Sequence, residues 1–242
     1  MPQTPGASIG LFYAYAKVIN TDWSGRYMIT FATRDVADTW FRAVTDSVAA
    51  GYRRFENVKR VSPQFYTHED AERNISETIN DPMVAPSLLG LVFFTLLNDK
   101  YARVLDPIPV LNYTDHLNGD SFYVRSVAQP DTYWYYDATE GTVIAHRYHR
   151  SQFIIKITNE ARAPGTIIIG SDEIYITSAT GVNIGATGHE NQLGPNANAF
   201  PFLFSSFSRK DFQIAHWEQD RGPSSLGPVK RNPRKGERWE LL

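Results

Sequence analysis

The sequence predicts an α+β N-terminal part followed by a β-rich C-terminal domain. Three observations indicate this organisation: a high aromatic content, one helical repeat of apolar residues near the N-terminus, and short strand-and-turn units after about residue 120. The chain has 242 residues, with 14 Phe, 13 Tyr and 5 Trp against only 3 Met. Aromatic side chains fit the pleated, half-buried surface of a sheet, so this composition favours strands.

The N-terminal part is predicted to contain a hairpin followed by a helix. Residues 9–19 and 26–33 have the composition of strands, and turn-forming residues separate them. Over residues 34–50, apolar residues such as Trp40 recur every four positions, which is typical of an amphipathic helix. Thr33 is suited to cap the N-terminus of this helix. Further extended segments are predicted at residues 55–67 and 88–97.

The C-terminal part alternates short strands with turns about every ten residues, which is typical of an all-β domain. The predicted strands are residues 122–127, 133–137, 142–148, 152–158, 166–170, 173–178, 200–206, 211–217 and 237–242. Residues 179–199 are rich in Gly and Asn and are predicted to form one long loop. Loops of this length inside a compact domain commonly carry function, so this segment is a candidate for part of a site.

These patterns predict two domains, an α+β domain over residues 1–115 and an all-β domain over residues 116–242. Within the second, Phe153, Phe212 and Trp239 each follow a polar residue at the start of a predicted strand. A threefold repeat of this kind predicts a β-trefoil. Another small barrel or sandwich, and a single continuous α+β domain, are the alternatives.

Charge and cysteine content exclude several classes of function. With a net charge of -2, the chain has no overall positive field, so nucleic acid is not expected as a partner. The absence of cysteine excludes disulfides, thiolate nucleophiles and cysteine-bound metals. The first residues lack the features of a secretory signal, and the longest apolar run, residues 88–97, is too short to span a membrane. A cytoplasmic protein without a membrane span is therefore expected.

No catalytic residue, cofactor or metal site is predicted. The sequence has no Gly-x-Ser-x-Gly motif, and none of its six histidines stands in a known triad context. His146 and His149 are three positions apart and are expected to face opposite sides of a strand, which would prevent them from sharing a metal ion. The glycines of residues 181–188 match neither a phosphate-binding loop nor a dinucleotide-binding motif, and they indicate turns.

Basic residues gather near the C-terminus, where two prolines are interleaved with them. They are Lys230, Arg231, Arg234, Lys235 and Arg238. Because Trp239 and Leu241 follow at strand spacing, the segment is predicted to form a solvated loop that leads into a packed final strand. A patch that binds polyanions is the alternative interpretation of the same segment.

The aromatic run Tyr133-Trp134-Tyr135-Tyr136-Asp137 contains the first half of the candidate ligand site. On a strand, Trp134 and Tyr136 face one side, and amphipathic rings of this kind can stack on a sugar while Asp137 accepts hydrogen bonds from its hydroxyls. The predicted long loop supplies the second half of the candidate site. Its amide side chains are Asn183, Asn191 and Asn196. The alternative interpretation is that both faces of the aromatic strand are buried.

Two resemblances bear on these expectations. The chain is similar to a family of small uncharacterised cytosolic proteins of mushroom-forming fungi, in the stretches Trp23–Met28, Pro63–Thr67, Phe93–Asp99, Tyr133–Asp137, Gly170–Glu173 and Trp239–Leu241. This resemblance implies a fungal cytosolic protein and no particular mechanism. The C-terminal half also resembles ricin-B-type β-trefoil lectins, whose repeated Gln-x-Trp corresponds here to Gln152-Phe153, Asp211-Phe212 and Arg238-Trp239. No site residue is carried over from those lectins.

Three hypotheses about function follow. The first is a non-enzymatic, lectin-like protein that binds a glycan or another small polar ligand. The second is a hydrolase with an acid and base formed by His and Asp or Glu, which a deep pocket holding a histidine against a carboxylate would indicate. The third is a structural or self-assembling protein, for which homo-oligomers are expected because exposed strand edges can pair.

Overall fold

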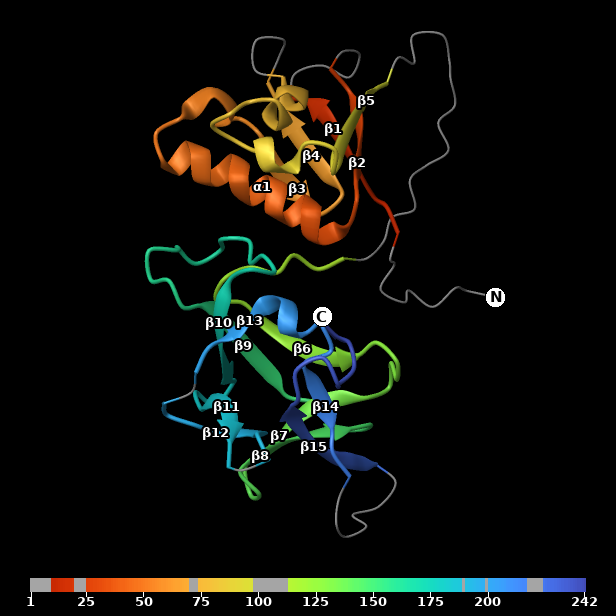
Figure 1. Cartoon of the computed structure of the whole chain (residues 1–242), viewed down its shortest axis with the longest axis vertical. Helices are drawn as coiled ribbons and strands as arrows, with labels where there is room; N and C mark the ends of the chain where they lie inside the picture. The colour runs from red at the N-terminus through yellow and green to blue at the C-terminus, as the bar shows by residue number, and fades with distance from the viewer. Residues whose placement is uncertain are drawn as a thin grey trace, which may run out of the picture. The chain divides into compact units, whose positions relative to one another are not determined.

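The structure is a computed structural model that describes residues 10–19, 25–69, 74–97, 113–188, 190–198, 200–216 and 224–242. The chain divides into two compact units, and the boundary between them lies between Asp115 and His116 (Figure 1). Strands dominate the described part of the chain, so the predicted β-rich class is confirmed. We call the two parts the N-terminal unit and the C-terminal unit.

The N-terminal unit combines a five-stranded sheet with the α-helix α1. The elements are β1 (Phe12–Val18), β2 (Tyr27–Phe31), α1 (Arg34–Ala49), β3 (Lys59–Ser62), β4 (Phe65–His68) and β5 (Val92–Leu96), with 3-10 helices at Arg53–Phe55, Ile75–Ile79 and Pro86–Leu88. The strand order is β3-β4-β1-β2-β5. β1 pairs in parallel with β4, whereas the β1–β2, β2–β5 and β3–β4 pairs are antiparallel.

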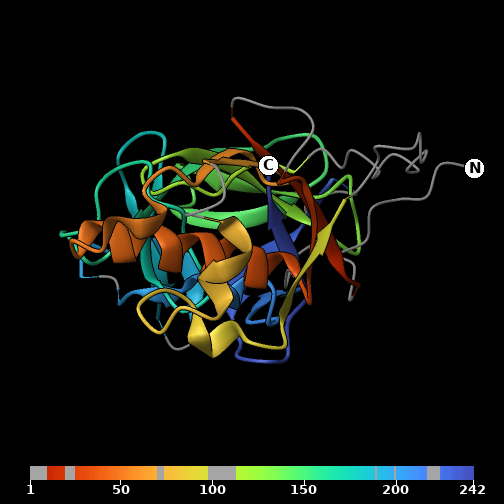
Figure 2. The ribbon, with the colours of Figure 1, turned by 90° about the horizontal axis from the view of Figure 1, so that it is seen from above.

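The predicted helix and its cap are confirmed. The Thr33 side chain accepts a hydrogen bond from the Val36 backbone N–H at 3.2 Å, which satisfies one of the free donors at the helix start. Trp40 is completely buried, and its ring lies 5.6 Å from the ring of Phe31 in β2 and 5.2 Å from that of Tyr66 in β4. The apolar stripe of α1 is therefore packed on the sheet, where Figures 1 and 2 show the helix beside the strands.

The C-terminal unit is all β apart from one short 3-10 helix at Phe204–Ser206 in its described residues. Its strands are β6 (Ser121–Ser126), β7 (Tyr133–Asp137), β8 (Thr142–His146), β9 (Gln152–Ile157), β10 (Glu173–Ser178), β11 (Asn183–Thr187), β12 (Gln192–Pro195), β13 (Phe202–Leu203), β14 (Phe212–Ile214), β15 (Ser225–Arg231) and β16 (Trp239–Leu241). Neighbouring pairs run in the order β11-β12-β15-β8-β7-β6-β9-β10, and β10 also pairs with β11, so the pairings form a closed circuit. β13, β14 and β16 add to β10, β15 and β6.

The core of the C-terminal unit is centred on aromatic rings. Trp134 is completely buried and lies within 6 Å of four rings, with centroid distances of 5.8, 5.7, 5.1 and 5.6 Å to Phe153, Phe207, Phe212 and Trp239. Such tilted and edge-on arrangements are favourable for aromatic pairs. Because these rings come from β7, β9, β14, β16 and the residue after the 3-10 helix, the cluster packs together segments that are far apart in sequence.

Several predictions for this unit are wrong in whole or in part. Residues 166–170 form no strand, and only Ile167 makes an isolated bridge there, to Leu117. Residues 179–199 are not one long loop, because β11 and β12 form a hairpin inside them. The basic segment is a loop only in its second part: β15 runs through Pro228 to Arg231, and a turn over residues 232–236 then leads to β16 as predicted. Proline has no N–H to donate, but the Pro228 carbonyl accepts a hydrogen bond from the Ala215 N–H at 2.8 Å, and only that group is needed there.

Gly227 is a residue of β15, which pairs with β8, β12 and β14, and it lies too close to a neighbouring backbone for a larger residue. It lies at a shift in the β8–β15 register, has φ +146°, and a Cβ at this position would lie 1.7 Å from the Ala215 carbonyl oxygen. Gly165 also has a positive φ, of +78°, but nothing lies within 4 Å of the corresponding position. Alanine substitutions at these two glycines therefore distinguish the effect of backbone strain, which both share, from that of steric overlap, which only Gly227 has.

We expect Gly227→Ala to lower the free energy of unfolding by about 1–3 kcal/mol more than Gly165→Ala, because only the first forces a methyl group into a backbone carbonyl. Urea denaturation followed by circular dichroism measures both variants. Equal losses for the two variants would contradict the steric interpretation and leave backbone strain as the common cause.

Candidate functional site

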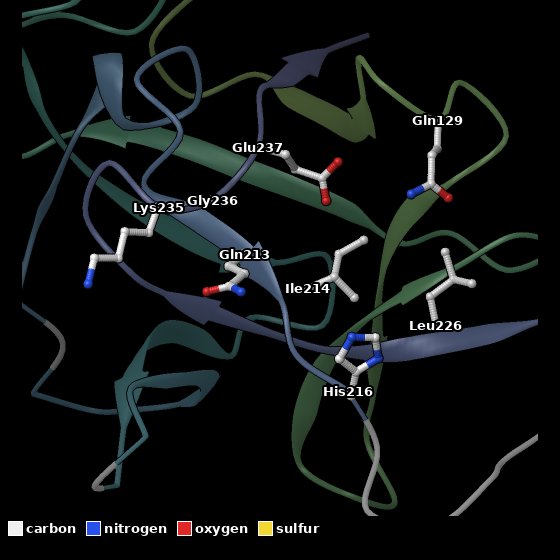
Figure 3. Close-up of a pocket in the computed structure, with 8 residues that line it drawn as sticks. All are labelled: Gln129, Gln213, Ile214, His216, Leu226, Lys235, Gly236 and Glu237. Carbon is white, nitrogen blue, oxygen red and sulfur yellow. The ribbon is translucent and has the colours of Figure 1, made fainter.

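Polar side chains from separate segments of the C-terminal unit meet around a cavity of about 460 Å³. Figure 3 shows the residues that line it, which are Gln129, Gln213, Ile214, His216, Leu226, Lys235, Gly236 and Glu237. We call this cavity the Glu237 pocket. Small-molecule sites are usually lined mainly by apolar side chains with a few polar groups, so this largely polar lining suits a polar ligand.

The strand ends of the unit hold these side chains in place. Gln129 lies in the turn between β6 and β7, where its N–H donates to the Ser126 Oγ at 3.1 Å and its carbonyl accepts from the Thr132 N–H at 2.8 Å. Glu237 lies just before β16, and its N–H donates to the Phe212 carbonyl at 2.9 Å. The backbone around the pocket is therefore set by hydrogen bonds between β6, β14 and β16 and not by the lining side chains themselves.

Glu237 is the acidic group of the pocket. Its burial raises the pKa of the carboxyl above the usual value, and a hydrogen bond from the Ser126 hydroxyl, 2.7 Å from Oε2, opposes this shift. Ser126 is completely buried, so its hydroxyl fixes one carboxyl oxygen and leaves Oε1 for other partners. A carboxyl of this kind is a strong hydrogen-bond acceptor when ionised and a donor when protonated.

The remaining polar groups supply both donors and acceptors. Gln213 accepts a hydrogen bond from Asn232 Nδ2 at 2.7 Å through Oε1, which leaves its Nε2 as a donor. In the part of the chain that the structure describes, the amide side chain of Gln129 makes no hydrogen bond. Figure 3 shows the Gln129 amide and the Glu237 carboxyl on one side of the cavity, with Ile214 below them.

Two further side chains complete the lining. Figure 3 places the His216 imidazole at the opposite end of the cavity from the Glu237 carboxyl, whereas the Lys235 ammonium points away from the other labelled groups. His216 is exposed, and Leu226 from β15 adds a second apolar side chain beside it. The pocket thus combines an acid, an imidazole, two amides and an apolar patch.

Trp134 does not lie at any surface site. The sequence indicated it as a stacking platform, but its side chain has 0% exposure and is enclosed by four aromatic rings. The alternation within β7 turns Trp134 toward the core. We therefore assign Trp134 to the core and leave it out of the site proposed below.

Tyr136 and Asp137 lie at the end of the same strand, away from the Glu237 pocket lining. Tyr136 is partly buried and packs against the core. The Asp137 carboxylate accepts hydrogen bonds from the Thr139 and Glu140 N–H groups, at 2.9 and 3.3 Å, and so closes the turn that leads to β8. These bonds give Asp137 a local structural role in the turn.

The three asparagines lie around the β11–β12 hairpin and are not gathered in one site. Asn183 accepts a hydrogen bond from the Thr177 hydroxyl at 3.1 Å, and Asn196 donates to the Ala186 carbonyl at 3.1 Å. Asn191 has a positive φ of 54° at the hairpin turn and lines a second cavity, described below. Of the six residues that the sequence indicated, only Asn191 lines either cavity.

His146 and His149 face each other, contrary to the expectation from strand geometry. β8 ends at His146 and the backbone turns, so the two rings lie 4.6 Å apart. The His146 Nδ1 accepts from the Tyr148 and His149 N–H groups, and burial, followed by the charge of His149, lowers the His146 pKa. Among the described residues, no three His, Asp or Glu side chains gather closely enough to hold a metal ion.

Sequence reasoning missed the Glu237 pocket because its members show no common pattern. Gln129, Gln213 and Glu237 come from three distant segments, and each is an ordinary polar residue near a strand end. Only the pairing of β16 with β6 and the bridge between Phe212 and Glu237 bring these segments together.

Comparisons with known proteins add no relative: no family model, curated protein or solved structure matches the chain. Within the described residues, no helix is long and apolar enough to cross a membrane.

Proposed function

We propose that this protein is a non-enzymatic, lectin-like binding protein and that the Glu237 pocket holds a glycan or another small polyhydroxylated ligand. The observation that supports this most directly is the set of free donors and acceptors around one cavity. Gln129, Gln213 and Glu237 offer both kinds of group, and none of these three is consumed by an ion pair in the described part of the chain.

Sugar hydroxyls suit such a pocket because each of them both donates and accepts hydrogen bonds. The Glu237 carboxylate would accept from one hydroxyl, and the Gln129 amide would donate to a neighbouring oxygen. Ile214 and Leu226 provide an apolar surface for the C–H face of a ring. A ligand without hydroxyls would leave Oε1 of the half-buried Glu237 carboxyl without a partner, since Ser126 bonds only Oε2.

A β-trefoil arrangement of the C-terminal unit is part of the proposal, and the order of its strand pairings supports it. The strands fall into three successive sets, β6 to β9, β10 to β13 and β14 to β16. In each set the first and last strands lie together: β6 pairs with β9, β10 pairs with β13, and Phe212 of β14 bridges to Glu237 beside β16. Between these strands lie the hairpins β7–β8 and β11–β12 and the strand β15, and β15 pairs with both β8 and β12.

The aromatic repeat supports the same arrangement in a revised form. The last strands of the three sets contain Phe153, Phe202 and Trp239, all of which belong to the core. Phe212 lies in the first strand of the third set, so Phe202 and not Phe212 is the counterpart of Phe153 and Trp239. This assignment makes the three sets more nearly equal in length than the one that the sequence indicated.

A cytoplasmic location also belongs to the proposal. The cysteine-free sequence supports it, because a reducing compartment does not select for disulfides. Fluorescence microscopy of the tagged full chain in a fungal cell would test it, and staining confined to the secretory pathway would contradict it.

A glycan array followed by calorimetric titration tests the binding proposal. We expect the wild-type chain to bind at least one glycan with micromolar to millimolar affinity, and Glu237→Gln to weaken that binding by about tenfold or more, because a charged hydrogen bond is replaced by a neutral one. Glu160→Gln, at an exposed position outside the lining, is the matched control and should leave the affinity unchanged.

The substitution itself should not unfold the protein. A carboxyl whose pKa is raised in the native state favours folding while it is protonated, and that contribution is lost as the pH rises through the folded pKa. At neutral pH, burial of the charged Glu237 carboxylate costs free energy, and the uncharged amide introduced by Glu237→Gln avoids this cost. The thermal midpoint should therefore stay level or rise. Absence of any glycan binding, or equal affinity in Glu237→Gln and the wild type, would contradict the proposal.

Hydrolysis by an acid and a base is the second candidate function, because one observation favours it. The Glu237 carboxyl has a raised pKa, as a general acid requires, and His216 lines the same cavity. Analysis of the glycan after incubation with the protein separates the two functions. Conversion of the bound glycan to smaller products, with turnover lost in Glu237→Gln, would indicate hydrolysis. A glycan recovered intact after prolonged incubation would indicate binding alone.

A further inference from the structure

A second cavity of about 380 Å³ lies in the C-terminal unit and differs in chemistry from the first. Its lining residues are Ala186, Asn191, Phe200, Phe202, Arg231 and Pro233. None of these residues lines the Glu237 pocket. We call it the Phe200 pocket.

Arg231 is the charged group of this pocket. It ends β15, where its backbone N–H donates to the Asn191 carbonyl at 2.8 Å, and its guanidinium carbon lies 5.4 Å from the ring centroid of Phe202. Phe202 is only 1% exposed, so the ring beneath the guanidinium is held by the core. Stacking of this kind restricts the planar guanidinium and presents its donors in a defined direction.

The charge of Arg231 has no counterpart nearby. Among the described residues, no carboxylate forms an ion pair with Arg231, and its buried Nε makes no hydrogen bond. Arg42 and Arg60, whose side chains are each 3% exposed, also have one buried nitrogen without a hydrogen bond, but both have an acidic partner. The missing carboxylate, and not the unbonded Nε, therefore distinguishes Arg231. A guanidinium that lacks an acidic partner keeps its charge and its Nη donors for a ligand, and an oxyanion is the group that pairs with them best.

Phe200 provides an apolar contact beside this cation. Its side chain is 83% exposed, which is the highest value among the large hydrophobic residues of the described chain. A single exposed apolar residue needs no explanation by itself. Here, however, the ring borders the same cavity as an unpaired guanidinium, so one ligand can contact both.

We propose that the Phe200 pocket binds a small organic oxyanion whose phosphate, sulfate or carboxylate meets Arg231 while a flat apolar face of the same molecule lies on Phe200. A guanidinium pairs with such groups through two parallel hydrogen bonds. Asn191 lines the same cavity, and its side-chain amide supplies a further donor for such oxygens. This site is independent of the function proposed for the Glu237 pocket.

Nuclear magnetic resonance titration with three probes separates the two contributions. Phenyl phosphate carries both the anion and the ring, inorganic phosphate carries only the anion, and phenol carries only the ring. We expect phenyl phosphate to bind about tenfold or more tightly than either of the other two, with shifts confined to Asn191, Phe200, Arg231 and their neighbours. Equal affinity for phenyl phosphate and phenol would overturn the proposal, because the guanidinium would then contribute nothing.

Matched variants assign each contribution to its residue. Arg231→Gln should reduce the affinity for phenyl phosphate by about tenfold, to that of phenol, because a charged pair is lost. Phe200→Ala removes an exposed ring without disturbing the core and should reduce the affinity for phenyl phosphate toward that of inorganic phosphate. Arg234→Gln changes an exposed charge of the same basic segment outside the lining and should have no effect.

The variants also distinguish a specific site from general attraction to basic charge. If Arg234→Gln weakens binding as much as Arg231→Gln, the segment acts only through its overall charge and the proposal is overturned. If Arg231→Gln loses the folded state, Phe200→Ala decides alone, and unchanged phenyl phosphate affinity in that variant overturns the proposal. Glucuronate against glucose repeats the comparison with a carboxylate on a sugar ring, and weaker binding of both than of phenyl phosphate indicates an aromatic ester as the preferred class.

Discussion

Replacing Trp134 with alanine is expected to lower the free energy of unfolding of the C-terminal unit by about 3–5 kcal/mol, the usual cost of truncating a fully buried aromatic side chain. Trp134 has no exposed surface and is enclosed by the rings of Phe153, Phe207, Phe212 and Trp239. Its removal would leave a cavity among rings that other parts of the core already hold in place. Urea denaturation followed by circular dichroism measures the loss.

A phenylalanine at the same position should cost much less. The Trp134 Nε1 is buried and has no hydrogen-bond partner among the described residues, so Trp134→Phe sacrifices packing but no hydrogen bond. We expect its loss to be less than half that of Trp134→Ala. Tyr148→Ala, at a side chain that is 79% exposed, should change stability by less than about 0.5 kcal/mol.

Two measurements would show that this account of Trp134 is mistaken. Hydrogen exchange should accelerate in β6 to β16 of Trp134→Ala and not in β1 to β5, because the two units have separate cores. Trp134→Phe should bind any ligand of the Glu237 pocket as tightly as the wild type. Uniform acceleration across the chain, or loss of ligand binding with a stable fold, would contradict a purely structural role.

Replacing Arg60 with methionine is expected to lower the stability of the N-terminal unit by about 3–5 kcal/mol. The buried carboxylate of Asp38 would keep only Arg34, at 3.4 Å, and the partly exposed carboxylate of Asp115 would lose the same partner. The Arg60 side chain is 3% exposed and lies between Asp38, at 2.7 Å, and Asp115. It also donates to the Tyr66 hydroxyl at 3.2 Å. Burial opposes the charge, but Tyr66, Asp38 and Asp115 outweigh this effect and hold the pKa of Arg60 above its usual range.

A surface arginine and a double variant control for this prediction. Arg53 has a side chain that is 78% exposed and contacts Glu56 at only 4.0 Å, so Arg53→Met should cost less than about 0.5 kcal/mol. Asp38→Asn combined with Arg60→Met should recover part of the loss, since the buried carboxylate that keeps only Arg34 as a partner is then gone. If the double variant is as unstable as the sum of its single variants, the pair is not coupled and the explanation fails.

Local patterns in the sequence were sufficient where one element carries its own signal. The helix at Arg34–Ala49 was predicted from apolar residues that recur every four positions and from Thr33 as the N-cap, and both signals lie within one short segment. β7 at Tyr133–Asp137 was predicted at its observed bounds, because an aromatic run between turns has few other conformations available. Aromatic content likewise indicated the strand-rich class.

Pairing partners overrode local signals elsewhere. Considered alone, Pro228 and Gly227 argue against a strand, yet both are buried in β15. Pro228 contributes its carbonyl, which accepts from the Ala215 N–H, and Gly227 lies at a register shift in the pairing with β8. The glycines and asparagines of residues 179–199 indicated a loop, and β12 nevertheless forms a ladder with β11 and joins β15. The composition of a segment indicates its own conformational preference. It carries no information about the unpaired strand edges with which that segment can pair in the folded chain.

By itself, the sequence determined the composition-level properties of this protein: a β-rich chain without cysteine chemistry, with one amphipathic helix ahead of many short strands. Tertiary structure alone decided the rest, including which face of β7 is buried and which polar residues share a cavity. The alternation along β7 is the same whether the face that carries Trp134 points to solvent or to the core. Only the aromatic rings that surround Trp134 in the folded chain show that this face is the buried one. The free donors and acceptors of the Glu237 pocket likewise exist only because β14, β16 and the β6–β7 turn meet in space.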